Sequence, residues 1–153
     1  MNNDNRKDFN EIKHIMENEY RKVGSIFNHA LQSEVVFNAN GWHHLRYDNN
    51  RSERSRPVQM NKFRFFSSAV KVISKSTTIQ EYRRKSENIN GREVIVEWFA
   101  FWSIISFLEE IRIKVIIKRR GGLGGIFYFW SVMPFWSLRH KQRFIGSQDM
   151  EQE

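Results

Sequence analysis

The chain has 153 residues, near the usual size of one domain, and its 40% hydrophobic content is enough for a packed core. Its 25 lysines and arginines outnumber its 17 acidic residues, so the net charge of +8 favours polyanionic partners, with nucleic acid ahead of an anionic membrane surface. Because there is no cysteine, disulfides, zinc-thiolate sites, cysteine nucleophiles and thiol redox chemistry are excluded.

The N-terminal part of the chain is predicted to be helical. Apolar residues recur at a three-or-four spacing over residues 8–31, which predicts an amphipathic helix that Gly24 could divide in two. Residues 35–37 form a short apolar run, and the turn after them offers N-cap residues for a short helix that includes residues 42–45. The polar residues 48–57 that follow are expected to form a solvated loop.

The pattern of residues 57–75 predicts a second long helix. Pro57 suits the first helical turn, and apolar residues from Met60 to Ile73 keep the spacing of one helical face. The cations of this segment are expected to lie off that apolar stripe: Lys62, Arg64, Lys71 and Lys75.

After Thr77 the composition becomes typical of strands, which are predicted over residues 78–83, 92–105, 111–119 and 126–133. Helices followed by strands indicate an α+β fold. No segment is predicted to span a membrane, because the longest apolar run, residues 94–108, is short and contains Glu97. Residues 1–7 lack the apolar stretch of a signal peptide.

The strand over residues 111–119 alternates between an apolar and a basic side. The apolar side has Ile111, Ile113, Val115 and Ile117, and the other side has Arg112, Lys114, Ile116 and Lys118. The glycine-rich residues 121–125 supply a turn into the next strand. A regular strand end would place Arg119 on the apolar side and Arg120 on the basic side, whereas a bulge at the turn would reverse them.

The histidines are not expected to form a metal site. His43 and His44 are adjacent, so on a helix they point about 100° apart and cannot share one ligand. The other histidines are scattered, and neither a metal nor another cofactor is expected.

Cleavage of RNA without a metal needs a proton acceptor, a proton donor and cations around the phosphate, which His, Lys and Arg side chains can supply. Each of these features also has an interpretation without function. In that interpretation the histidine is simply a half-buried helix residue, the strand cations are a solvated face, and the tryptophans are part of the core. The tryptophans concerned are Trp98, Trp102, Trp130 and Trp136.

Several short motifs follow one another in a distinctive order. They are Asn-Gly-Trp-His-His-Leu at 40–45, an arginine-rich loop, the helix around residues 63–73, Glu-Tyr at 81–82, Phe-Trp at 101–102, the basic strand end at 115–120 and Phe-Trp-Ser-Val at 129–132. This order resembles that of phage-associated BECR-type nuclease domains, the fold shared by barnase, the EndoU nucleases, the colicin tRNases and the RelE toxins. The resemblance covers about residues 35–133.

The resemblance implies N-terminal helices packed on a four-stranded antiparallel sheet, with the active site on the sheet face opposite the helices. It divides the chain into an amphipathic helix over residues 1–34, a nuclease-like domain over 35–134 and a tail over 135–153 that is first basic and then acidic.

The resemblance further implies a metal-independent endoribonuclease that cleaves RNA by attack of the 2′-hydroxyl. His44 would be the general acid or base, Arg119 or Arg120 would stabilise the phosphorane, Ser131 would contact the phosphate, and Tyr82 is a second proton-transfer candidate. The expected RNA-binding residues are His43, Arg54, Arg56, Arg112, Lys114 and Lys118, with Tyr128 or Phe129 stacking a base.

The expected partners are RNA, with tRNA as one candidate, and an acidic antitoxin or immunity protein that blocks the basic groove. No membrane partner is expected, and the protein would act in the cytoplasm of its own cell or of a target cell. The alternatives are a non-catalytic nucleic-acid-binding module on the same fold, in a phage or mobile element, and a structural component of such an element.

Overall fold

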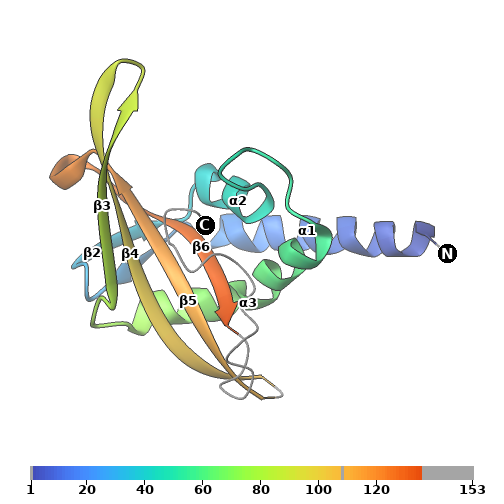
Figure 1. Cartoon of the computed structure of the whole chain (residues 1–153). Coiled ribbons are helices and arrows are strands. Elements are labelled where there is room, and N and C mark those ends of the chain that lie inside the picture. Colours follow the sequence, from blue (N-terminus) through green and yellow to red (C-terminus); the bar gives the residue numbers. More distant parts are fainter. Residues whose placement is uncertain (1, 108, 136–153) are drawn as a thin grey trace.

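Three helices lie on one side of a six-stranded sheet in the computed structural model, which describes residues 2–107 and 109–135 (Figure 1). The helices are α1 (Asn2–Val23), α2 (Ala39–Arg46) and α3 (Arg56–Lys75). The strands are β1 (Ser25–Asn28), β2 (Ser33–Val36), β3 (Glu81–Ile89), β4 (Arg92–Phe107), β5 (Glu109–Arg120) and β6 (Phe127–Phe135), and a 3-10 turn, η1 (Gly122–Gly124), joins β5 to β6. The order in the sheet is β1-β2-β6-β5-β4-β3.

The α+β class is confirmed, and the strands predicted over residues 92–105, 111–119 and 126–133 correspond to β4, β5 and β6. The strand predicted over residues 78–83 overlaps β3 only at residues 81–83. β3 to β6 are successive antiparallel neighbours. The four-stranded antiparallel sheet is wrong, because two short strands extend it and β2 pairs in parallel with Phe127 and Tyr128 of β6. The helix predicted over residues 8–31 is too long at its C-terminal end, because residues 25–28 form β1. Gly24 takes a positive φ of 67°, and α1 ends at the residue before it.

The first 34 residues belong to the same core as the rest of the sheet. β1 pairs with β2, and Tyr20 on α1 is 2% exposed, with its hydroxyl donating to the Asn38 carbonyl oxygen at 2.7 Å. Burial raises the pKa of Tyr20. Of the predicted tail, only Phe135 lies within the described residues, as the end of β6.

Both faces of the sheet carry buried apolar side chains. The face that the helices cover holds the larger core, which includes Phe66 of α3 and Phe129 of β6. The opposite face holds a second core of Val96, Trp98, Ala100, Ile116 and Met133, with Trp102 and Trp130 packed against it.

The β5 strand alternates as predicted. Ile117 pairs with Phe99 and Arg119 with Glu97, on the side of the larger core, while Arg120 pairs with Val96 of the second core. The pairing with β4 remains regular to the strand end, so Arg119 and Arg120 point to opposite faces.

Lys62 contradicts the prediction that the cations of α3 lie off its apolar stripe. It is 4% exposed. It precedes Phe66, Ala69 and Ile73 by four, seven and eleven residues, so it shares their helical face.

Gly41 permits α2 to approach β6 closely. A Cβ at this position would clash with the Phe129 carbonyl oxygen and the Tyr20 hydroxyl. We expect Gly41→Ala to lower the free energy of unfolding by about 1–3 kcal/mol, because the helix must move away from the strand. Gly124→Ala is the matched control, since a Cβ there meets nothing within 4 Å. Urea unfolding of both variants measures the effect, and equal midpoints would contradict this account of the α2–β6 contact.

Candidate functional site

His44 lies where α2 packs against β6. The helix begins after Asn38, whose side-chain oxygen accepts a hydrogen bond from the Gly41 backbone N–H at 3.2 Å. The His44 imidazole stacks on the Trp130 indole, with ring centroids 3.8 Å apart and planes 14° apart. His44 is 3% exposed, so packing fixes the position of its ring.

Arg54 contacts His44 at two points. Its Nε donates to the His44 carbonyl oxygen at 3.0 Å, and its Nη2 lies 3.2 Å from the imidazole Nε2. Because a guanidinium only donates hydrogen bonds, Nε2 must be the acceptor and carries no proton in this arrangement. The imidazole is therefore neutral here.

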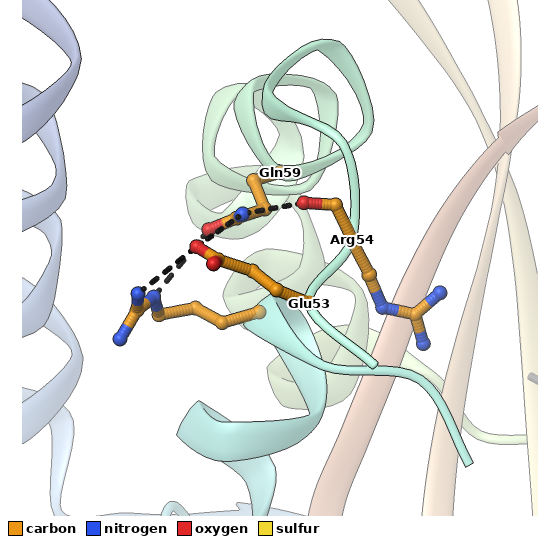
Figure 2. Close-up of polar contacts among 4 residues, drawn as sticks. Glu53, Arg54 and Gln59 are labelled. Atoms are coloured by element: carbon orange, nitrogen blue, oxygen red, sulfur yellow. Dashed lines mark hydrogen bonds and ion pairs between the residues drawn. The ribbon is translucent and has the colours of Figure 1, made fainter. Parts of the chain in front are cut away.

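A buried glutamine of α3 holds the loop that carries Arg54. Gln59 is 1% exposed, and its Nε2 donates to the Arg54 carbonyl oxygen at 2.7 Å and to Glu53 Oε1 at 3.4 Å (Figure 2). Arg46 Nη2 lies 3.4 Å from the same Glu53 oxygen. Figure 2 shows the Arg54 guanidinium pointing away from these contacts, toward β6. The loop predicted to be solvated is thus fixed at Arg54.

Trp130 is the extra residue of a β-bulge. Ile116 of β5 pairs with Ser131, and the next residue, Ile117, pairs with Phe129, so Trp130 has no opposite residue. A bulge turns the side chains of the longer strand away from regular alternation. The indole packs against the second core and also meets α2 at the edge of β6.

Lys118 lies against the other face of the same indole. Its Nζ is 4.0 Å from the Trp130 ring centroid and 5.4 Å from that of Trp98. His44 stacks at 3.8 Å on one face of Trp130, which leaves only the opposite face for the ammonium. Burial lowers the pKa of Lys118 to about 8, and the charge of Arg120 acts in the same direction. Lys118 makes no hydrogen bond or ion pair with any described residue.

Ser131 is fully buried beside Trp130. Lys62 reaches it from α3, with Nζ donating to Ser131 Oγ at 2.9 Å and to the Val132 carbonyl oxygen at 3.2 Å. This contact brings a second buried lysine to the site.

We call this set of residues the Trp130 cluster: His44, Arg54, Lys62, Lys118, Trp130 and Ser131. The indole N–H groups of Trp130 and of the neighbouring Trp98 are buried and donate to no acceptor among the described residues. With the Lys118 ammonium, the site has three donors that lack an acceptor within the described residues. Such a surplus suits an anionic ligand, whose oxygens only accept hydrogen bonds.

Arg119 and Tyr82 lie on the opposite face of the sheet and are not brought to the Trp130 cluster. Arg119 Nε donates to Glu97 Oε1 at 2.8 Å, and the Tyr82 hydroxyl donates to Glu97 Oε2. Burial alone would raise the pKa of Glu97, but these hydrogen bonds hold it below its ordinary value. Burial, and then the hydrogen bond to Glu97, raise the pKa of Tyr82. Arg120 is exposed on the face of Lys118.

Arg112 and Lys114 share the face of Lys118 but gather around Trp102. The Arg112 guanidinium and the Lys114 ammonium lie 5.4 Å and 5.2 Å from its ring centroid, and Lys114 Nζ forms an ion pair with Glu81 at 2.5 Å.

The alternative that the basic side of β5 is only a solvated face is wrong at two of its lysines. Lys114 and Lys118 are 1% and 6% exposed. Their cross-strand partners on β4 are Trp102 and Trp98, and opposite side chains in a sheet are close enough for an indole to cover a lysine stem.

His43 and Arg56 lie apart from the cluster. The exposed His43 ring stacks on Tyr47 with centroids 4.5 Å apart, and Arg56 lies over Phe9 at 5.1 Å. Tyr128 is buried and Phe129 belongs to the larger core, so neither presents a free ring for stacking a base.

The comparisons leave the chain without an identified family: no family model matches it, and neither does any curated protein or solved structure. Within residues 2–107 and 109–135, no three potential His, Asp or Glu metal ligands come together. No helix in this part of the chain has the length and apolar content needed to span a membrane.

Sequence reasoning missed Lys62, Gln59 and the role of Trp130. The position of Lys62 on the apolar stripe was a usable signal, since it precedes Phe66 by four residues. No comparable signal in the sequence identified the role of Trp130. A bulge depends on how β6 pairs with β5, and the sequence of β6 does not specify that pairing.

Lys118 should make stability depend on pH. Its pKa is about 8 in the folded protein and near 10.5 in the unfolded chain, so between these values the unfolded chain binds more protons and stability rises with pH. Lys118→Met lacks this effect. We expect this variant to have a higher free energy of unfolding than the wild type at pH 7. This difference should shrink by on the order of 3 kcal/mol by pH 10.

Urea unfolding at pH 7, 8.5 and 10 tests this dependence. Lys22→Met, at an exposed position of α1, is the matched control and should follow the wild type at every pH. A difference between Lys118→Met and the wild type that stays constant over this range would contradict the burial of a titrating ammonium.

Proposed function

We propose that the protein is an endoribonuclease that reacts at the Trp130 cluster and cleaves RNA through attack of the 2′-hydroxyl. The observation that carries the proposal is the convergence of His44 from α2, Arg54 from a loop and Lys118 from β5 on one indole ring. The three donors without acceptors favour a phosphate as the bound group. The order of motifs that resembles BECR-type nucleases supports RNA as its source.

The two proton transfers divide between His44 and Lys118. A bond forms between the 2′-oxygen and phosphorus and the bond to the 5′-oxygen breaks, which yields a 2′,3′-cyclic phosphate and a 5′-hydroxyl. Neutral His44 suits the base that takes the 2′-hydroxyl proton, and the Lys118 ammonium suits the acid that protonates the 5′-oxygen. Side chains supply both transfers, so the proposed reaction requires no metal.

The phosphate itself would release His44. Arg54 occupies the imidazole Nε2, but a guanidinium bonds more strongly to a phosphate oxygen than to a neutral ring nitrogen. On binding, Arg54 would move to the phosphate and leave Nε2 free to accept a proton. Ser131 and Lys62, which lie beside Trp130, would contact the same phosphate, and Arg120 would add charge on the Lys118 face.

A second candidate function is a nucleic-acid-binding module without catalysis. The burial of His44 favours it, because a histidine that is 3% exposed is also a satisfactory packing residue. Both functions imply RNA as the ligand, tRNA included, in the cytoplasm of the host or of a target cell. Both also allow an acidic antitoxin or immunity protein as the inhibitor, since carboxylates complement a basic site.

Cleavage in EDTA tests the assignment. The purified protein should cleave total RNA with EDTA present, and His44→Gln should lower the rate by roughly 10²-fold or more, because a positioned proton transfer is lost. His43→Gln, one residue away but exposed, should retain activity, as should Tyr82→Phe on the opposite face. Urea midpoints of the variants show whether each remains folded. Absent cleavage, or undiminished cleavage by a folded His44→Gln variant, would leave only the binding module.

The pH dependence of the cleavage rate should also show the titration of Lys118. If its ammonium is the acid, kcat/KM should fall as pH rises through about 8, where the proton leaves. Lys118→Met should abolish this fall of kcat/KM at high pH and lower the rate, whereas Lys22→Met should change neither the pH profile nor the rate. A wild-type profile that is flat between pH 7 and 9.5 would exclude Lys118 from proton transfer.

A further inference from the structure

Helix α3 has an unusual charge distribution for a surface helix. Its 20 residues include five cations, Arg56, Lys62, Arg64, Lys71 and Lys75, and no aspartate or glutamate. A cation in the last turn is favourable to the helix dipole, which accounts for Lys75. The dipole does not account for the cations of the earlier turns, or for the absence of acidic residues along the whole helix.

Three of these cations line one groove. Arg64, Lys71 and Lys75 are spaced by seven and four residues, so they form a stripe along one side of α3. The groove lies between α3 and the later part of β4, and its volume is about 560 Å³. The two elements can be followed in Figure 1. Hydroxyls of Ser67, Ser68 and Ser76 lie on the same side, and none of the described residues that line the groove is acidic.

Two of the three cations of this groove, Lys71 and Lys75, have no neutralising partner among the described residues. Lys71 and Lys75 are exposed, and neither ammonium makes an ion pair or hydrogen bond with another described residue. The floor between the cations and β4 includes Val72 and Ile105. Cations and hydroxyls above a partly apolar floor fit a sugar-phosphate chain, which presents anionic oxygens and apolar ring carbons together.

The size of the groove favours a single strand. Its volume is in the ordinary range for a small-molecule site, enough for a nucleotide and too small for a duplex. The stripe from Arg64 to Lys75 extends about 17 Å along the helix axis, so it can meet more than one phosphate of an extended strand.

The same helix joins this groove to the Trp130 cluster. Lys62, which donates to Ser131, lies on α3 about 14 Å along the axis from Lys71. Trp102 is among the residues that line the groove, and its ring, which packs against the second core, lies beside Arg112 and Lys114 on the Lys118 face. Because nine residues turn an α-helix by about 180°, Lys62 and Lys71 lie on opposite sides of α3, and a strand bound with one phosphate at the cluster would pass around the helix to reach the groove.

We infer that the groove between α3 and β4 binds the sugar-phosphate backbone of the single-stranded RNA that flanks the reacting phosphate. This inference rests on the proposed function for the position of the reacting phosphate. The groove contributes affinity for long substrates and takes no part in bond breaking.

Neutralising the groove tests this inference through binding. The probe is a 2′-O-methyl RNA oligonucleotide of about 12 nucleotides, which has no free 2′-hydroxyl and so cannot react. Lys71→Gln/Lys75→Gln should raise its dissociation constant about tenfold. The slope of log K against log salt concentration should become shallower by about 1.4, because each phosphate contact on a single strand contributes about 0.7.

A matched double variant controls for net charge. Lys13→Gln/Lys22→Gln removes two charges from α1, which does not line the groove, and should bind as the wild type does, apart from a small general effect of charge. In cleavage assays the groove variant should show a raised KM and an unchanged kcat for the long substrate, and no change for a dinucleotide.

The outcomes separate this inference from the proposed function. Binding that weakens in the groove variant, in a protein that cleaves nothing, would support the groove and reject the nuclease. Cleavage with equal binding by the groove and control variants would overturn the groove and leave the nuclease. Preferential binding of phosphatidylserine vesicles over the oligonucleotide, lost in the groove variant, would assign the groove to a membrane surface and overturn the inference.

Discussion

The stacking of Trp130 between an imidazole and an ammonium is the contact on which the rest of the site depends. His44 of α2 lies on one face of the indole, and Lys118 of β5 lies on the other. The ring reaches this position because a bulge in β6 takes it out of the regular alternation of the strand. One side chain therefore joins the helical layer to the second core and also sets the separation of the His44 imidazole and the Lys118 ammonium.

Arg119 and Lys118, on the two sides of β5, differ in whether a carboxylate neutralises their charge. Arg119 is paired with Glu97, which also accepts from Tyr82, so the charges on that side are balanced and the arrangement is structural. Lys118 is buried between indoles with no carboxylate partner among the described residues. An unpaired buried cation costs stability, and a cost of this kind is typical of a residue kept for binding or reaction. This contrast moves the candidate site away from Arg119 and toward Lys118.

Much of the architecture could be predicted from periodicity. The three-or-four spacing identified α3 nearly to the residue, and the alternation of β5 placed Arg119 and Lys118 on opposite sides. His44 could be selected from its motif, and Arg54 from the charge of its loop. The helix and strand predictions succeeded because they depend on neighbours within one element, where a side chain's direction follows from its position. The selection of His44 and Arg54 as site residues stays a prediction.

The burial and the partners of these residues were decided only by the tertiary structure. β1 and β2 are four residues each, too short for a distinctive pattern, and their places in the sheet depend on pairing with each other and with β6, about ninety residues later. Lys118 became buried because β4 places Trp98 opposite it, and His44 met Trp130 through a close approach at Gly41 and a bulge. The sequence by itself determined which side chains share a face. Which groups those faces meet was decided by contacts between distant segments, since no local pattern records them.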